Sequence, residues 1–485
     1  MDNETKVQDT GSESKFSKFF KIRERGSNVK TEIIAGLTTF FAMAYIVVTN
    51  PNQVVGFTFG GAYDKIWNAV YVASILVAVV GTLLYALYAK LPFAQACGMG
   101  LNSFFFVSFI LPAVLSGSDP INGYREGLCI ILCSGILFLI LSITGARQYI
   151  AKALPDCLKK AIPAGIGLFI AFIGFKNAGI IEANQYTFVQ LFDFHGRVMA
   201  GPDFITAWRN IAPVVFALLG LFLIAVLDKK NVKGSVIISI GSITVLYYLC
   251  TWQLPVFDFG KIVQSFKDFG EIGIIGAFKG FGVFAGGVIA VINAIVLVIT
   301  FTLVDMFDTI GTLYGTASQA DMLDENGDPI DVDKAMACDS IATCAGAVLG
   351  TSTCTTFVES ASGVAAGGRT GLASLVTSGC FLLCLFLTPL AAIVPACATA
   401  PALIYVGVLM LKNFAKVDMS DIAQAVPAFM ALIMMPLTYS ISNGIAVGAI
   451  AYTIITLATG KYTKKDIVVT LIAILFTLRF FLVTM

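Results

Sequence analysis

The chain has 485 residues, of which 57% are hydrophobic and only 13% are charged. Ordinary soluble domains carry about 25% charged residues, so the composition speaks against a soluble protein and indicates an integral membrane protein. The net charge of +1 gives no reason to expect nucleic-acid binding. The single histidine, His195, falls in a polar connection and cannot supply a histidine cluster for metal binding or catalysis.

The eleven cysteines form no CxxC pair, and several stand inside apolar runs, for example Cys129 and Cys344. There they behave as small apolar residues. We therefore expect free thiols rather than a disulfide framework, and neither a cofactor nor a metal.

Residues 1–30 are polar and charged, and no apolar segment precedes Ile33. This pattern does not fit a cleavable signal peptide. We expect an N-terminal tail over residues 1–30 whose basic, aromatic end, from Lys15 to Arg25, lies on the membrane surface.

A membrane-spanning helix needs about 20 mostly apolar residues. Fourteen stretches fit this pattern: 32–50, 68–89, 95–114, 125–144, 160–179, 210–227, 232–251, 283–316, 336–350, 353–366, 371–394, 398–412, 421–438 and 441–459. A further apolar stretch, 467–484, contains Arg479, and the sequence leaves open whether it spans the membrane or lies at its interface.

Basic residues set the expected orientation, because they are enriched on the cytoplasmic side of a membrane protein. The N-terminal tail is rich in Lys and Arg, and counting spans from it puts Lys90, the Arg147–Lys160 cluster and Lys461–Lys465 on the same side. We therefore expect a multi-pass protein of the plasma (cell) membrane with a cytoplasmic N-terminus.

Two segments seven spans apart suggest an internal repeat. Ala161–Ile166 opens the fifth span, and the similar Thr399–Ile404 opens the twelfth. An odd number of spans per repeat inverts the second copy in the membrane. The expected organisation is a first repeat at 31–251, an extracytoplasmic connection at 252–282, a second repeat at 283–459 and a C-terminal apolar segment at 460–485.

The third and tenth spans, which correspond under this repeat, are both rich in residues that weaken a helix. Cys97–Asn102 contains two glycines, and Thr351–Thr356 contains four threonines. Unwound backbone is tolerated in a membrane only where protein or a water-filled cavity satisfies it. Interrupted segments at matching repeat positions point to a substrate site, although close helix packing would also explain Gly98 and Gly100.

Three acids stand in or beside apolar runs, where acids are costly and usually functional. Asp305 and Asp308 are three residues apart and share one helix face. Two carboxylates this close cannot easily both be ionised in a low dielectric, which suits a carrier that loads and releases a proton. Glu359 is the third. The structural alternatives are capping of a broken helix and pairing with a Lys or Arg.

Other candidate site residues are less specific. Asn102 offers both a donor and an acceptor, or a satisfied interhelical bond. Phe40, Phe41, Tyr45 and Phe357 supply rings that could stack on a flat ligand or simply pack. The carboxylates and the amide in these spans suit a neutral, planar ligand rich in N–H groups, such as a purine base. Because these spans contain almost no Lys or Arg, they disfavour anionic substrates.

At this point the residues resemble a known family. Glu32–Pro51 looks like the first-span signature of the AzgA-like purine permeases, in the second class of nucleobase–cation symporters within the xanthine/uracil permease superfamily. The further motifs that resemble this family are Gly98–Asn102, Val304–Thr312, Thr351–Gly363 and Gly367–Leu372.

The resemblance implies an all-α polytopic fold of fourteen spans in two inverted repeats of seven, with short strands in spans three and ten. A core domain (spans one to four and eight to eleven) moves against a gate domain. The implied function is import of guanine, hypoxanthine or adenine with protons, and family members can be dimers. Asn102, Asp305 and Glu359 would line the purine site, with Gly100 and Asp308 beside it.

Our site prediction therefore joins both lines of reasoning. The expected substrate contacts are Asn102, Asp305, Glu359, Gly100, Phe357 and Phe40, and the expected proton-coupling acids are Glu359, Asp305 and Asp308. Two alternatives stay open: an uncoupled facilitator, or a symporter for uracil or xanthine. An intramembrane enzyme is disfavoured because no loop supplies a nucleophile or metal ligands.

Overall fold

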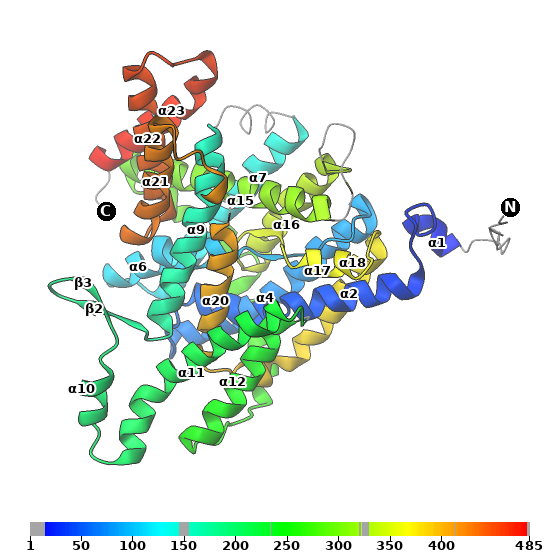
Figure 1. Cartoon of the computed structure of the whole chain (residues 1–485), viewed down its shortest axis with the longest axis vertical. Coiled ribbons are helices and arrows are strands. Elements are labelled where there is room, and N and C mark those ends of the chain that lie inside the picture. The colour runs from blue at the N-terminus through cyan, green and yellow to red at the C-terminus, as the bar shows by residue number, and fades with distance from the viewer. Residues whose placement is uncertain are drawn as a thin grey trace.

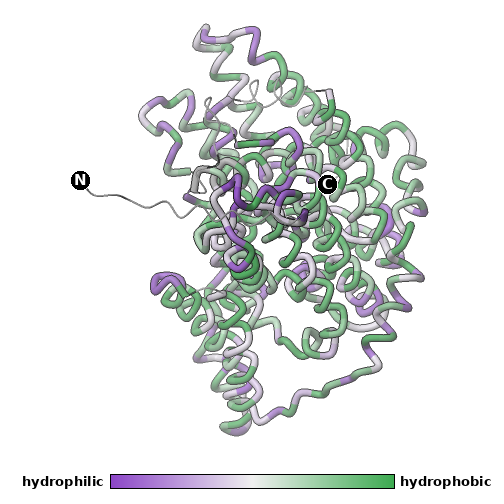
Figure 2. Tube along the Cα trace, turned by 90° about the vertical axis from the view of Figure 1, so that its right-hand side faces the viewer, coloured by the Kyte–Doolittle hydropathy of each residue, from purple (hydrophilic) through white to green (hydrophobic). Residues whose placement is uncertain are grey.

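The computed structural model describes residues 15–482 except 145–154, 233, 320–321, 323–328 and 413. Its helices pack into a bundle in which segments far apart in sequence lie side by side, such as α9 and α20 (Figure 1). Hydrophobic residues run along most of the helices, and hydrophilic stretches gather at connections and edges (Figure 2). This distribution is that of a protein surrounded by lipid.

In the described part of the chain, nine helical stretches are long and apolar enough to cross a membrane. They are Val29–Val54 (α2 and α3), Ala62–Ala89 (α4 and a π-turn), Pro120–Ile143 (α7), Asp156–Asn177 (α9), Phe204–Lys229 (α11), Gly287–Ile310 (within α15, Gly287–Gln319), Gly371–Ala391 (α18 to α19), Ala396–Lys416 (including α20, Ala396–Leu411) and Ile441–Ala458 (α22). Shorter apolar helices are Met99–Leu115 (α5 to α6), Ser235–Thr251 (α12) and Ile422–Leu437 (α21).

Several spans begin where a side chain satisfies the first free backbone N–H groups of a helix. Asp119 Oδ1 accepts from Ile121 N at 2.9 Å before α7, and Asp203 Oδ1 accepts from Thr206 N at 2.7 Å before α11. Ser440 caps α22 in the same way. These polar caps mark the ends of the apolar segments and explain why the helices start there.

Two strands interrupt the helical bundle where the sequence predicts unwound backbone. β1 (Gln95–Cys97) pairs antiparallel with β4 (Cys354–Thr356), with Ala96 opposite Thr355. Gly98 N donates to Thr353 O at 3.0 Å and Phe357 N to Ala94 O at 3.0 Å, extending the pairing at both ends. Strand pairing satisfies backbone groups that a broken helix would leave bare in the membrane.

Short helices continue both strands. The helix α5 (Met99–Phe105) follows β1, and α17 (Ser360–Ala365) follows β4. Two further helices, α15 and α16 (Val332–Leu349), pack against β4. The strand pair is thus enclosed by helices from both halves of the sequence.

The segments with the repeated motif pack tightly on each other. Both α9 and α20 contain an internal proline, Pro163 and Pro401. A Cβ on Gly167 would lie 2.9 Å from Gly407 O, and a Cβ on Gly407 would collide with Gly167 O. This reciprocal glycine contact lets the two backbones approach closely.

The connections outside the long helices hold the remaining elements. A hairpin of β2 (Ile181–Asn184) and β3 (Phe188–Leu191) precedes α10 (Phe194–Met199), which carries the exposed His195. The stretch before α15 contains α13 (Gly260–Asp268) and α14 (Gly276–Lys279). All eleven cysteines are free thiols.

The basic stretch near the N-terminus has a protein partner rather than only the membrane surface that we expected. After α1 (Lys15–Phe20), Phe20 and Ile22 are buried against Leu372 of α18. Arg25 Nη1 donates to Lys90 O at 2.7 Å and to Arg369 O at 3.1 Å. The C-terminal apolar segment forms α23 (Ile467–Leu482), which packs on α22.

Candidate functional site

Four acids surround the strand pair, and they fall into two sets by burial. Asp305 in α15 and Asp339 in α16 are fully buried, and we call them the back pair. Asp308 in α15 and Glu359 just before α17 are only half-buried, and we call them the front pair. No described lysine or arginine forms an ion pair with any of the four.

Asp305 binds the strand pair through one hydroxyl group. Thr343 Oγ1 lies 2.8 Å from Asp305 Oδ2 and 3.0 Å from Cys354 O, and it accepts from Cys354 N at 3.1 Å. The second oxygen, Oδ1, is buried and has no hydrogen-bond partner among the described residues. Because such an orphaned oxygen is costly, a proton or a ligand N–H is its natural partner.

Asp339 is a buried acid that our sequence reasoning missed. Its Oδ1 accepts from Gln95 Nε2 at 2.8 Å, and its Oδ2 accepts from Thr309 Oγ1. Thr356 Oγ1 lies 3.4 Å from Oδ1 and 2.5 Å from Tyr85 OH. The carboxylate therefore ties β1, β4 and α15 together. The signal was present, because Asp339 lies inside the expected span 336–350.

Glu359, in the front pair, has an aromatic hydroxyl as its partner. Tyr45 OH lies 2.5 Å from Glu359 Oε1 and 3.4 Å from Met99 Sδ. Tyr45 stands at the break between α2 (Val29–Met43) and α3 (Ile46–Val54), where the helix is interrupted. The break in span one thus brings a phenol donor to the acid of span ten.

Asp308 is the least constrained of the four acids. Its carboxylate has no hydrogen bond or ion pair with the residues that the structure describes. It lies close enough to Glu359 for the two to repel each other when both are charged. A proton shared between them or a ligand N–H group would relieve that repulsion.

Asn102 joins three broken spans. Its Nδ2 donates to Gln53 Oε1 at 3.2 Å, and its Oδ1 accepts from Ser352 Oγ. Gln53 Nε2 is itself buried without a partner in the described chain. Asn102 is therefore partly satisfied by the protein, and the amide of Gln53 beside it retains an unused donor.

Gly100 lies where α5 meets α9. A Cβ at Gly100 would collide with Ile166 Cγ2 and lie 3.5 Å from Ile170 Cδ1. The absence of a side chain therefore lets α5, two residues before Asn102, lie directly on α9.

The two predicted aromatic contacts pack against apolar neighbours. Phe357 is buried in the apolar core next to β4. Phe40 packs edge-on against Phe381 of α18, with ring centroids 5.3 Å apart. Within span one, the structure brings Tyr45 rather than Phe40 to Glu359.

One further buried acid serves a different purpose. Glu32, at the start of α2, accepts from Arg369 N at 2.9 Å and from Thr370 N at 3.2 Å. It thereby satisfies backbone donors just ahead of α18. Burial alone therefore does not identify an acid as a site residue, because the role of a buried acid depends on its hydrogen-bond partners.

The comparisons with known proteins agree with this architecture. A model described as "Permease family" matches residues 30–447. The guanine/hypoxanthine permease PbuO of Bacillus subtilis (strain 168) is 40% identical over 467 residues, covering 96% of this chain and 100% of that protein. The adenine permease AdeQ of Escherichia coli (strain K12) is 35% identical over 489 residues, covering 100% of both chains.

Among solved structures, the transmembrane domain of a cyanobacterium bicarbonate transporter, BicA, superposes with a TM-score of 0.58 at 16% identity. The match covers 92% of this chain and 97% of that one. At this identity the likeness concerns the fold alone. The family match and the near-complete relatives show that the chain is a transporter rather than an enzyme and belongs to the permease family of the xanthine/uracil type, among its AzgA-like members.

Proposed function

We propose that this protein imports purine nucleobases, with guanine, hypoxanthine and adenine as candidate cargoes, together with protons. Relatives covering nearly the whole chain are named as guanine/hypoxanthine or adenine permeases, which supports the cargo class. The observation that carries the coupling is the front pair, two half-buried carboxylates on elements that pack together, α15 and the residue before α17, with no basic partner in the described chain.

In this proposal the purine binds against the front pair and Asn102. A carboxylate accepts two N–H groups of a purine edge, and a protonated acid donates to a ring nitrogen or carbonyl. The lack of an ion-paired cation at these acids favours a neutral ligand over an anion. Tyr45 holds Glu359 in one orientation, which fixes the edge that the ligand meets.

Protonation sets the direction of transport. When one front acid binds a proton, the repulsion between Asp308 and Glu359 disappears and the site accepts a neutral base. Release of the base into the cytoplasm accompanies loss of the proton at the higher pH there. Because both steps use the same two carboxylates, proton and purine movement are linked.

The proposed moving parts are those that the resemblance to the purine permeases implies. The core domain contains α2 to α7 and α15 to α18, and the gate domain contains α9, α11, α12 and α20 to α22, in two inverted repeats of seven spans. In this proposal the core domain slides against the gate domain at the interface of α5 with α9, beside Gly100. The N-terminus is placed in the cytoplasm by the distribution of basic residues.

Uptake of radiolabelled hypoxanthine, guanine and adenine tests the proposal in cells that lack their own purine carriers. Accumulation above the external concentration, abolished by a protonophore, is expected for at least one base. Equilibration that ignores the protonophore would identify an uncoupled facilitator. Competition by uracil or xanthine, with no purine uptake, would identify the alternative cargo.

A further inference from the structure

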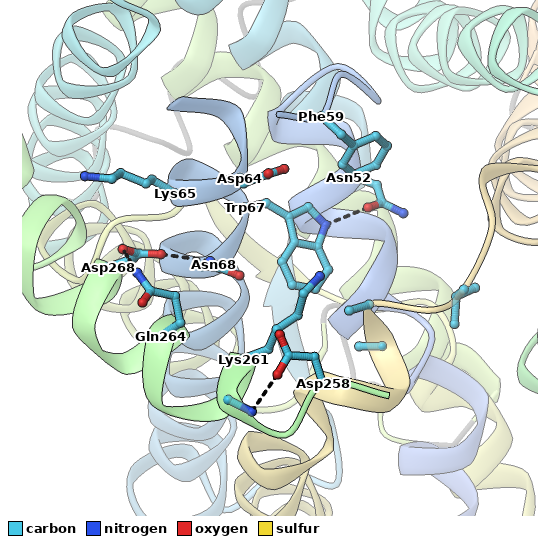
Figure 3. Close-up of a pocket in the computed structure, with 14 residues that line it drawn as sticks. Asn52, Phe59, Asp64, Lys65, Trp67, Asn68, Asp258, Lys261, Gln264 and Asp268 are labelled. Carbon is cyan, nitrogen blue, oxygen red and sulfur yellow. Dashed lines mark hydrogen bonds between the residues drawn. The ribbon is translucent and has the colours of Figure 1, made fainter. Parts of the chain in front are cut away.

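A polar pocket of about 520 Å³ has none of the four acids in its lining. It is formed by the start of α4, by α13 and by the connection after α19, and it falls within the roughly 300 to 1,000 Å³ typical of small-molecule sites. Figure 3 shows its lining, which includes Asn52, Trp67, Asn68, Gln264 and Asp268.

One side of the pocket is a pre-formed array of amides around a carboxylate. Asp268 is 1% exposed, and it accepts from Asn68 Nδ2 at 2.8 Å and from Gln264 Nε2 at 2.7 Å. Ser265 Oγ donates to Asn68 Oδ1 at 3.3 Å. These bonds link α4 to α13 and hold the polar groups in fixed positions (Figure 3).

A second side is aromatic and apolar. Trp67 Nε1 donates to Asn52 Oδ1 at 2.7 Å. Asn52 is 3% exposed, and its amide nitrogen has no hydrogen-bond partner in the chain as described. Phe59, which is 57% exposed, stands beside them and precedes Gly60 and Gly61, both at positive φ. The exposed Phe59 ring gives this side of the pocket a flat apolar surface on which a planar ligand can stack.

The charges of the lining disfavour an anion. The lining holds two lysines, Lys65 and Lys261, and three aspartates, and Lys65 pairs with Glu271 at 3.6 Å. A neutral, planar molecule with N–H donors and carbonyl acceptors matches the amides and the aromatic side together.

The pocket lies at the opposite end of the second span from the site where the N-terminal segment docks. That span runs for 28 residues from Ala62 to Ala89, about 42 Å at 1.5 Å per residue. Arg25 contacts Lys90 just beyond its far end. With the N-terminus in the cytoplasm, the pocket opens on the extracytoplasmic side.

From this arrangement we propose that the pocket is a second, outer binding site for a purine nucleobase, occupied before the base reaches the front pair. This inference rests on the proposed function, since it gives the same substrate an additional binding site ahead of the front pair. The outer site concentrates substrate at the entrance, and it does not take part in proton coupling.

Tryptophan fluorescence tests this directly, because Trp67 is one of only three tryptophans. Trp208→Phe with Trp252→Phe leaves Trp67 as the sole tryptophan, and retained purine uptake shows that this variant is folded. Hypoxanthine is titrated into the purified variant, with and without Glu359→Gln and Asn102→Ala to disable the inner site. We expect saturable quenching in both backgrounds.

A matched pair of ring deletions locates the signal. Phe59→Ala should weaken the quenching affinity about threefold to tenfold, whereas Phe257→Ala, an exposed ring outside the pocket lining, should leave it unchanged. Absence of quenching once the inner site is disabled would overturn the outer site, as would equal affinity in Phe59→Ala and the parent. If the parent imports purines without that quenching, the outer-site proposal is wrong but the proposed function stands. If the parent neither imports purines nor shows quenching, the proposed function is wrong as well.

Discussion

The back pair and the front pair are made of the same kind of side chain but behave as opposites. Asp305 and Asp339 are fully buried: Asp339 accepts from Gln95 and Thr309, and Asp305 accepts from Thr343 while its Oδ1 has no partner among the described residues. Asp308 and Glu359 are half-buried, and between them they have one described side-chain partner, Tyr45. The comparison teaches that Asp339, whose two oxygens are both bound by protein groups, holds the fold, whereas the half-buried front pair is free to exchange a proton.

The largest expected effect is on transport at the front pair. Glu359→Gln keeps an oxygen that Tyr45 OH can reach but removes the ionisable group. We expect proton-driven accumulation of purine to fall by about tenfold to a hundredfold, since hydrogen bonds to charged groups contribute about 1.5–3 kcal/mol. Uptake assays, with membrane levels of the variant matched to the parent, measure this. Unchanged accumulation would remove Glu359 from the mechanism.

The next effect is on stability at the back pair. Asp339→Ala leaves Gln95 Nε2 and the Thr309 hydroxyl without their acceptor in a buried place. Each unsatisfied group costs about 1–3 kcal/mol, so we expect a clearly lower melting temperature in detergent. Asp308→Ala is the matched control on the front pair and should melt close to the parent. If both variants melt alike, the division of the acids into two pairs is wrong.

A third prediction concerns the contact between α5 and α9. Gly100→Ala forces a methyl group against Ile166 Cγ2, and overpacking of this kind costs about 1–3 kcal/mol. We expect uptake to fall about tenfold. Adding Ile166→Ala to Gly100→Ala removes Cγ2 and should restore much of the uptake, whereas Ile170→Ala, at the more distant contact, should restore less. Equal rescue by the two would argue against a specific contact at Ile166.

The smallest effect is expected at Tyr45. Tyr45→Phe removes one hydrogen bond to Glu359 but keeps the ring, so purine affinity should fall about threefold to tenfold with little change in melting temperature. Tyr85→Phe is the matched control, because Tyr85 OH lies against Thr356 in the back network. That variant should lose stability rather than affinity. The opposite pattern would reverse the roles of the two tyrosines.

The sequence predicted the features that depend on local composition. The apolar spans and the interruptions at Cys97–Asn102 and Thr351–Thr356 correspond to elements of the structure, and the short strands there were implied by the family resemblance. Glycine and threonine weaken helices whatever surrounds them, so these breaks could be recognised without knowing the fold.

The partners of each acid could not be predicted in the same way. Gln95 meets Asp339, 244 residues later, and Tyr45 meets Glu359, 314 residues later, so these contacts exist only once distant segments of the chain have packed together. Ring packing follows the same logic, because Phe40 meets Phe381 only when α2 lies on α18. Whether Asn102, Asp305 and Glu359 contact a purine stays a prediction.

The central claim is that the front pair couples purine movement to protons. Its most direct test is a purine gradient imposed across proteoliposomes of the purified protein, with a pH-sensitive dye inside and hypoxanthine added outside. We predict acidification of the lumen by the parent protein and none by Glu359→Gln, although both proteins melt alike. Equal acidification by the two proteins, or hypoxanthine entry into parent proteoliposomes without any pH change, would contradict the account.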